Sequence, residues 1–260
     1  MNRVTTAFQK HKAIIGYLTV GYPDIETTIR AATMLADSGC DIIELGIPFS
    51  DPIGDGPTIQ HASYRALANG ITPAVCLSVA TEINKKTRVP LIFMSYYNPI
   101  LSYGLDRFCQ DSSRAGIAGL IVPDLPPEES EELDKETASH NIALIHLLAP
   151  TSPEVRIRLV ADKSRGFIYL TSVTGVTGTR ACLPDYLPEF IRRVKNLAYQ
   201  PLCVGFGIST PEQAVEILEL ADGVIIGSKI MQYVELNHDL SELQDFISRI
   251  RNARDGLGLS

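Results

Sequence analysis

Residues 13–46, AIIGYLTVGYPDIETTIRAATMLADSGCDIIELG, contain one complete strand–helix–strand repeat. The apolar, β-branched runs at its two ends, AIIGYLTV and DIIELG, are typical of buried strands. Between them, Asp24 can cap a helix, apolar residues from Ile29 to Ala36 recur at helical spacing, and Gly39 can end the helix. The segment therefore predicts a βα repeat that leads into the next strand.

The same unit recurs along the whole chain. Six further strand runs follow: VPLIFM, AGLIVPD, IALIHLLAP, GFIYLTS, PLCVGFG and GVIIGS. Eight runs close a parallel barrel, whereas an open doubly wound sheet usually has fewer. Several runs are apolar throughout, which also suits a buried helix, but their shortness and their Gly and Pro boundaries favour strands.

Helix signals lie between the later runs. PEESEELDKETASHN opens on Pro127 and acidic residues, and PEQAVEILELADG places Pro211 at a first turn and Gly223 at the predicted helix end. No linker or low-complexity tract divides the chain. We therefore expect one domain over residues 1–260, a single (β/α)8 TIM barrel with extra helical segments.

Composition excludes several classes of function. Lys and Arg total 23 against 30 Asp and Glu, a net charge of −7 with no basic face, so nucleic acid is not an expected partner. The five cysteines form no C-x-x-C pair and are expected to be reduced thiols, neither a disulfide framework nor a zinc site. The N-terminus lacks a signal-peptide pattern and no apolar run approaches ~20 residues, which predicts a cytoplasmic protein without a membrane span.

The segment ELGIPFSDPIGDGPTIQ, residues 44–60, places three carboxylates, Glu44, Asp51 and Asp55, after the second strand, where barrel enzymes hold catalytic groups. Strand alternation puts Ile42 and Glu44 on one face, and a polar group fits the barrel mouth better than the helix-covered side, so we predict that Glu44 points inward. Burial would raise its pKa and suit it to carry a proton in both directions. A structural Glu paired with Lys or Arg, and a turn-capping Asp55, are the alternatives that spacing alone leaves open.

Glycine-rich segments follow the last three strands. They are SVTGVTGTR with Gly175 and Gly178, VGFGIS at 204–209, and IIGS at 225–228. Glycine lets backbone N–H groups approach an anion, and a helix that starts just beyond adds its positive end. Each alone suits an ordinary turn, but three at consecutive strand exits predict phosphate binding, and the first also suits a lid.

Several strings together resemble tryptophan synthase alpha subunits, in that family's order and spacing from about Gly16 to Lys229: ELGIPFSDPIGDGPTIQ, MSYYNPILSYG, LIVPDLPPEES, LLAPTSP, YLTSVTGVTG and VGFGIS. The resemblance implies retro-aldol cleavage of indole-3-glycerol phosphate to indole and glyceraldehyde 3-phosphate. It places Glu44 on the family's catalytic glutamate, Asp55 on its catalytic aspartate, and Tyr169 on an active-site tyrosine near the glutamate.

The resemblance also implies ligand and partner contacts. Phosphate would bind at Gly178, Gly207, Gly227 and Ser228 with Phe206 nearby, and Tyr17 and Tyr96 would line the indole pocket. No metal or organic cofactor is expected in this chain. A pyridoxal-phosphate-dependent beta subunit would complete an αββα heterotetramer and receive indole through a tunnel, with Pro48, Asp51 and Asp124 at positions that face it. Solvated loop polarity is the alternative for the two aspartates.

Two positions depart from the family pattern. Gly54 stands where Ala or Val is more frequent and could loosen the loop that carries Asp55, and Lys229 stands where a small residue is usual. The alternative function is a catalytically weak alpha subunit that acts mainly as an allosteric activator of the beta subunit. Another phosphosugar barrel enzyme, such as an isomerase or indole-3-glycerol phosphate synthase, would not require PFSDPIGDGPTIQ and would carry a strand-end lysine that is not evident here.

Overall fold

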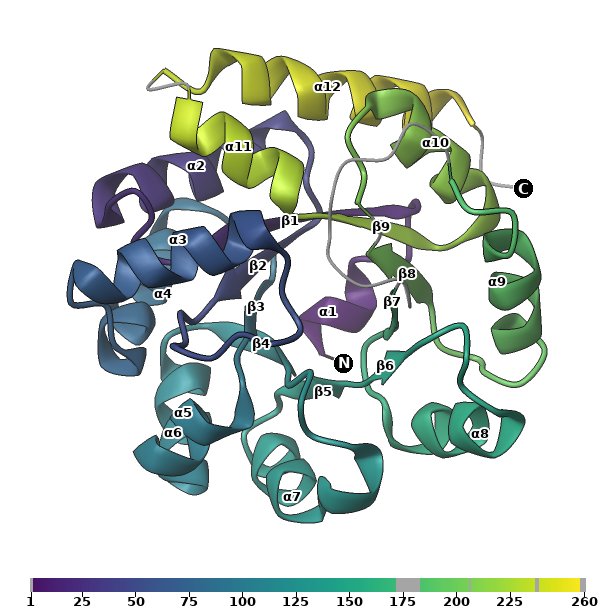
Figure 1. The fold of residues 1–260 in the computed structure, drawn as a ribbon, viewed down its shortest axis with the longest axis horizontal. Helices are drawn as coiled ribbons and strands as arrows, with labels where there is room; N and C mark the ends of the chain where they lie inside the picture. Colours follow the sequence, from purple (N-terminus) through teal and green to yellow (C-terminus); the bar gives the residue numbers. More distant parts are fainter. Residues whose placement is uncertain (1, 172–182, 206, 237–238, 258–260) are drawn as a thin grey trace.

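The computed structural model describes residues 2–171, 183–205, 207–236 and 239–257 (Figure 1). The strands are β1 (Ala13–Thr19), β2 (Ile42–Gly46), β3 (Leu91–Met94), β4 (Ile117–Ile121), β5 (Ala143–Ile145), β6 (Leu147–Leu148), β7 (Ile168–Thr171), β8 (Leu202–Gly205) and β9 (Gly223–Ile226). The helices are α1 (Arg3–Thr6), α2 (Ile25–Ser38), α3 (Pro57–Ala68), α4 (Pro73–Lys86), α5 (Tyr97–Tyr103), α6 (Leu105–Arg114), the 3-10 turn η1 (Pro127–Glu129), α7 (Glu131–Ser139), α8 (Glu154–Lys163), α9 (Leu187–Lys195), α10 (Pro211–Leu220), α11 (Ser228–Leu236) and α12 (Ser241–Gly256).

All strand pairs are parallel, and the sheet order β5-β4-β3-β2-β1-β9-β8-β7-β6 forms a nearly closed barrel. The prediction of eight strands differs from the nine found in the described residues, because the fifth run is divided at His146. The His146 N–H donates to the Ser164 hydroxyl at 3.1 Å instead of to a neighbouring strand, while its carbonyl accepts from Tyr169 N at 3.0 Å. β5 and β6 are therefore two halves of one barrel strand, and the chain itself links them.

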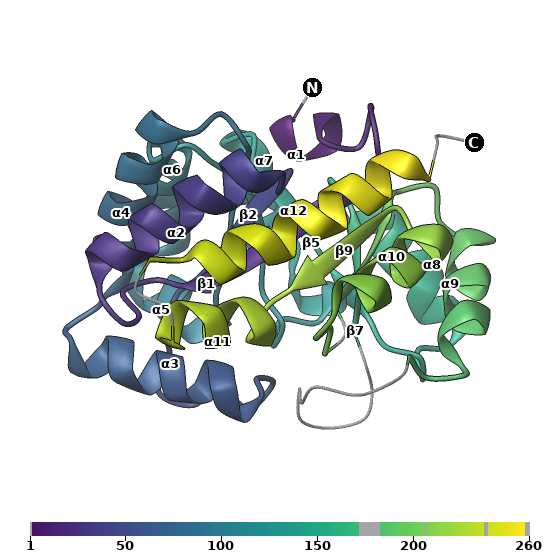
Figure 2. The ribbon, with the colours of Figure 1, turned by 90° about the horizontal axis from the view of Figure 1, so that it is seen from above.

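Helices cover the outside of the barrel, as Figure 1 shows. One helix lies after each barrel strand and completes the predicted repeat: α2, α4, α6, α7, α8, α9, α10 and α12. The others, α1, α3, α5 and α11, are the extra helical segments. Figure 2 shows α1 at one end of the barrel and α3 at the other. The predicted TIM barrel is thus confirmed; that residues 1–260 form one domain stays a prediction.

Helix boundaries follow local chemistry. The Asp24 carboxylate accepts from Thr27 N at 2.7 Å and starts α2, and Gly39, with φ 120°, ends it. At α10, Thr210 and Gln213 form a capping box and Pro211 occupies the first turn. The predicted end of this helix is wrong, because α10 stops at Leu220. Gly223 instead opens β9, where an added Cβ would lie 2.7 Å from Cys203 Sγ.

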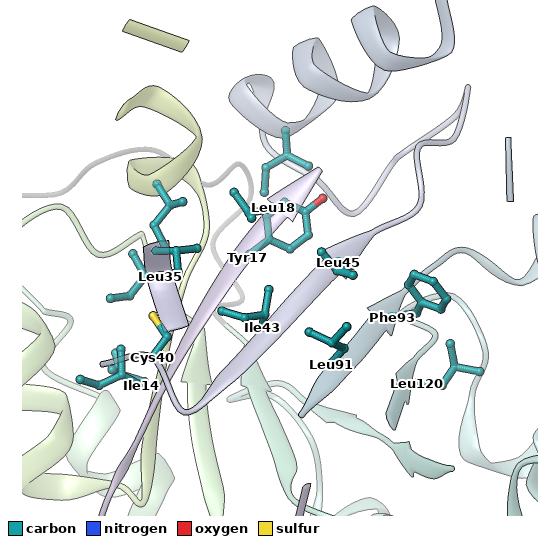
Figure 3. Close-up of a cluster of buried hydrophobic side chains, with 14 of the residues drawn as sticks. Ile14, Tyr17, Leu18, Leu35, Cys40, Ile43, Leu45, Leu91, Phe93 and Leu120 are labelled. Carbon is teal, nitrogen blue, oxygen red and sulfur yellow. The ribbon is translucent and has the colours of Figure 1, made fainter. Parts of the chain in front are cut away.

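The core has an outer and an inner part. In the outer part, side chains from β1 to β4 such as Ile14, Ile43, Leu45 and Phe93 pack toward the helices (Figure 3). The inner part fills the barrel with Val4, Ala13, Ile15, Ile42, Ile92, Ala118, Ile121, Ala143, Ile145, Phe167, Cys203 and Ile225. Val4 comes from α1, so this short helix closes the end of the barrel at which the strands begin.

The described cysteines are buried and form no disulfide among themselves. Cys40, Cys76, Cys109 and Cys203 are free and buried, and Cys182 lies outside the described residues. In the described part of the chain, no single helix combines the length and apolarity needed to cross a membrane. Among the described helices, one pair meets those two criteria when taken together, namely α3 and α4, across a bend of 102°.

Candidate active site

A cavity lies at the carboxyl ends of the barrel strands. Its lining combines two acids, two tyrosines and several glycines: Tyr17, Glu44, Gly54, Asp55, Ile59, Met94, Pro123, Leu147, Tyr169, Thr171, Gly205, Gly207, Ile208, Ile225, Gly227 and Ser228. Among these described residues there is no Lys, Arg or His. The chemistry available from this lining is therefore that of carboxyl and hydroxyl groups and backbone amides.

Glu44 points into this cavity from β2, as strand alternation predicts. It is 1% exposed, with Tyr17 on β1 and Ile92 on β3 as its register neighbours. Within the described residues its Oε2 accepts no hydrogen bond and no Lys or Arg pairs with it, so the alternative of a salt-bridged structural Glu finds no support there. Burial, and then the charge of Asp55, raise the pKa of Glu44 to about 8. The group is consequently a protonated carboxylic acid near pH 7.

Asp55 reaches the cavity from the loop between β2 and α3. Its N–H donates to Pro52 O at 3.0 Å, and Gln60 Nε2 donates to its carbonyl at 2.9 Å, so backbone and side-chain bonds hold the loop. The Tyr96 hydroxyl donates to Asp55 Oδ2 at 3.3 Å. Burial raises the pKa of Asp55 to about 6, while the Tyr96 hydrogen bond opposes that rise. Near pH 7 the two carboxyls therefore differ, with Asp55 mostly ionised and Glu44 protonated.

Tyr17 and Tyr169 occupy the cavity wall in matching ways. Tyr17 pairs with Glu44 on β2 and Tyr169 pairs with Cys203 on β8. Two residues beyond each partner, at the next position on the same face of the strand, stands a glycine, Gly46 or Gly205. A Cβ on these glycines would stand 2.1 Å and 2.2 Å from the respective tyrosine hydroxyls. Burial, together with the nearby carboxyls, raises the pKa of both phenols well above its ordinary value. Both rings therefore require glycine at the facing position, where a side chain would collide with the hydroxyl. Both hydroxyls stay neutral.

Glycine-rich strand exits form another part of the lining. Gly207 follows β8, and Gly227 and Ser228 join β9 to the first turn of α11. Helix N-termini and glycine backbones of this kind suit an anion. The other predicted phosphate residues, Gly178 and Phe206, lie outside the described residues, as does Gly175.

The remaining predicted residues lie around the cavity. Tyr17 lines it, but Tyr96 is not among its lining residues and stacks on Phe49 with ring centroids 5.2 Å apart. Pro48 is buried, whereas Asp51 and Asp124 are exposed. The structure therefore brings Glu44, Asp55, Tyr169, Gly207, Gly227 and Ser228 together at one cavity and places the predicted partner-facing residues outside it.

The two departures from the family pattern have local explanations. Gly54 N donates to the Tyr96 hydroxyl at 2.9 Å, and a Cβ at Gly54 would lie 3.2 Å from that oxygen. Glycine therefore permits the loop to approach Tyr96 closely. Lys229 carries its ammonium over the Tyr233 ring, 4.5 Å from the centroid, and lines a separate hollow between α10, α11 and α12.

Sequence reasoning missed part of the lining. Thr171 stands two residues after Tyr169 on the same face of β7, and Gly205 stands two residues after Cys203. Alternation along each strand, applied to Tyr169 as it was to Glu44, could have found both. Pro123 and Ile208 come from loops, for which the sequence offers no comparable periodic signal.

The fold and the cavity together define a TIM-barrel protein with a buried pair of carboxyls and a glycine-rich anion niche at the strand ends. The family model described as tryptophan synthase alpha chain matches residues 4–256. The chain belongs to this family.

Individual relatives agree in sequence and in structure. The tryptophan synthase alpha chain of Dehalococcoides mccartyi is 55% identical over 255 residues, covering 98% of this chain and 100% of that protein. The solved Mycobacterium tuberculosis tryptophan synthase is similar with a TM-score of 0.91 at 38% identity, covering 97% of this chain and 98% of that chain. The tryptophan synthase alpha chain of Legionella pneumophila has a TM-score of 0.88 at 34% identity, with 100% of both chains covered.

Proposed function

We propose that this chain cleaves indole-3-glycerol phosphate to indole and glyceraldehyde 3-phosphate by a retro-aldol reaction. The observation that carries the proposal is Glu44, a buried carboxylic acid in the cavity whose Oε2 has no hydrogen-bond partner among the described residues. Such a group needs a function, because an unpaired buried carboxyl is unfavourable for folding. Family membership supports the same activity.

The difficulty of this reaction is that indole C3 must leave with the bonding electron pair. Protonation of C3 solves it, since the ring becomes an indoleninium cation that accepts the pair when the carbon–carbon bond breaks. Glu44 donates that proton and, as a carboxylate, accepts the proton of the substrate hydroxyl that becomes the aldehyde. Asp55, ionised near pH 7, accepts the indole N–H and offsets the positive charge. Tyr169, with a neutral hydroxyl, completes the catalytic group.

Substrate binding follows from the rest of the cavity. The phosphate binds at Gly207, Gly227 and Ser228, together with the predicted Gly178 and Phe206. Tyr17 provides an aromatic wall for the indole ring. We propose no metal or organic cofactor in this chain, because the two carboxyls carry every proton that the reaction moves.

The partner is proposed to be a tryptophan synthase beta subunit that holds pyridoxal phosphate and receives the indole within an αββα heterotetramer in the cytoplasm. An exposed apolar surface beside the cavity loop supports a partner here, since Ile53 is 87% and Tyr64 is 72% exposed. The exposed Asp51 lies on the loop after β2, which also holds the buried Pro48, and the exposed Asp124 lies on the loop after β4.

The test is indole release from indole-3-glycerol phosphate by the purified chain, with and without the beta subunit. Glu44→Gln keeps the shape of the side chain but removes proton transfer, so turnover should fall at least ~100-fold while substrate binding is retained. Glu82→Gln, on the exposed face of α4, is the matched control and should retain wild-type turnover. If wild type releases no indole in either condition, the lyase proposal fails and the activating role remains.

A further inference from the structure

We infer that Tyr96 is a positioning residue for Asp55, and that Asp124 holds Tyr96 in place from the loop after β4. The inference rests on the proposed function, because it concerns the carboxylate that would accept the indole N–H. It gives both residues roles that differ from the indole-pocket and partner-facing roles implied by resemblance.

Tyr96 contacts the loop after β2 at three points. Its hydroxyl donates to Asp55 Oδ2 at 3.3 Å and accepts the Gly54 N–H at 2.9 Å. Its ring stacks on Phe49 with an interplanar angle of 29°. Tyr96 is only 5% exposed, so these contacts are protected from water. A single side chain thus fixes the backbone at Gly54 and the carboxylate of the next residue.

Asp124 fixes the segment that carries Tyr96. Tyr96 is the N-cap residue of α5, and its own side chain caps nothing. The free N–H of Tyr97 donates instead to Asp124 Oδ1 at 2.8 Å, across 27 residues of sequence. A carboxylate at a helix N-terminus stabilises the first turn. The conformation of Tyr96 therefore depends on a side chain in the loop after β4.

The backbone around this link is already fixed by strand contacts. Ile47 N donates to Met94 O at 2.8 Å, and Ser95 N donates to Ile121 O at 3.0 Å, which join the ends of β2, β3 and β4. In addition to these backbone bonds, side-chain hydrogen bonds of Tyr96 and Asp124 connect the three loops. These contacts form a chain from Asp124, through Tyr97 and Tyr96 at the start of α5, to Asp55, and we call this chain of contacts the relay.

The groups that face Asp55 determine what the relay changes. They are the Tyr96 hydroxyl, the Glu44 carboxyl, and the buried phenols of Tyr17 and Tyr169. Of these, Tyr96 donates a hydrogen bond to the carboxylate and lowers its pKa, opposing burial. Loss of that bond leaves burial unopposed. Asp55 would then hold its proton to higher pH and would be less able to accept an indole N–H.

The test compares Tyr96→Phe, Asp124→Ala and Asp124→Asn in the full chain. The titration of Asp55 is followed by carboxyl carbon NMR, and kcat/KM for indole release is measured across pH. In Tyr96→Phe, the midpoint of the Asp55 titration and the midpoint of the acid limb of the kcat/KM profile should both rise by about 0.5–1 pH unit. At pH 6, kcat/KM should fall roughly 3- to 10-fold. Asp124→Ala should move both in the same direction by about half as much. Asp124→Asn keeps an acceptor oxygen and should resemble wild type.

Tyr103→Phe is the matched control, because it removes a tyrosine–aspartate hydrogen bond, to Asp111 at 2.9 Å, from the far end of the same helix. It should leave the Asp55 titration unchanged. The inference is overturned if the Asp55 midpoint in Tyr96→Phe coincides with that of wild type, whatever happens to activity. A shifted midpoint in a chain that releases no indole would instead support the relay and contradict the proposed function.

Discussion

The two ends of the barrel interior are built from the same strand faces but differ in chemistry. At the end closed by α1, inward positions are apolar. Along β1, β2, β7, β8, β9 and the residues that flank them, the position two residues further on is polar or glycine. The pairs are Ile15 and Tyr17, Ile42 and Glu44, Phe167 and Tyr169, Cys203 and Gly205, and Ile225 and Gly227. A step of two residues is about 7 Å. A single inward layer therefore separates core from site.

This difference shows how the barrel can tolerate an unpaired buried acid. The apolar layer below Glu44 fills the interior and contributes stability, whereas Glu44 and the other side chains of its layer line the cavity together with glycines and loop residues. Stability and reactivity are thus assigned to different heights of one β-barrel. This difference between the two layers can be tested by placing a carboxyl in the apolar layer or by removing the carboxyl from the cavity layer.

The largest effect is expected when an acid enters the lower layer. Ile42→Glu places a carboxyl among the apolar side chains of the inner core, at a position that is 0% exposed. It should lower the free energy of unfolding by at least ~4 kcal/mol, measured by urea denaturation. Ile53→Glu makes the same exchange at a position 87% exposed and should change stability by less than about 0.5 kcal/mol. A stable Ile42→Glu variant would contradict the assignment of the lower layer to packing.

A smaller effect of opposite sign is expected at Glu44. The pKa of Glu44 is raised from its ordinary value of 4.5 to about 8 in the folded chain, so between these pH values the folded state binds more protons than the unfolded state. Wild type should therefore lose stability as pH rises from about 4.5 to 8, and Glu44→Gln should escape that loss. The variant should be about as stable as wild type at pH 4.5 and roughly 2–4 kcal/mol more stable at pH 8.

Urea unfolding at the two pH values measures this difference. Glu82→Gln is the control, since Glu82 lies on the surface beside Lys85 and should show no comparable gain. Equal stability of Glu44→Gln and wild type at pH 8 would mean that Glu44 is not desolvated in the folded chain.

The smallest effect is expected at the glycine that accommodates Tyr17. In Gly46→Ala the new methyl group would meet the Tyr17 hydroxyl at 2.1 Å, so the ring must move within the cavity wall. We expect a loss of about 1–2 kcal/mol in stability and roughly a 10-fold fall in kcat/KM for indole release. Gly256→Ala, with no atom within 4 Å of the added methyl, is the control. Wild-type kinetics in Gly46→Ala would show that the Tyr17 position does not matter to the site.

Much of the fold could be predicted because its signals are local. Strand runs, the Asp24 cap and the Pro211 start depend on neighbouring residues, and they appear where predicted. The division of the fifth strand could not be predicted, since it depends on Ser164, 18 residues away in sequence, which accepts the His146 N–H. The function of Gly223 was misassigned for a similar reason, because its close contact is with Cys203 on another strand.

The candidate site shows the same limit. Periodicity alone oriented Glu44, and resemblance selected Asp55 and Tyr169, all of which line the cavity. The contacts of Tyr96 and Asp124 were not foreseen, because hydrogen bonds between three loops leave no pattern in sequence. Resemblance therefore names the residues, while the loop contacts decide how they are held.

The short helix α1 has a consequence for the order of assembly. Asn2 Nδ2 donates to Ala118 O and to Asn141 O, across 116 and 139 residues, and Val4 packs in the interior with Phe167. The full set of contacts made by Asn2 and Val4 therefore forms only when the chain as far as Phe167 is available. Closure of the barrel floor by α1 is therefore a long-range step, because it needs contacts with both the central and the later strands.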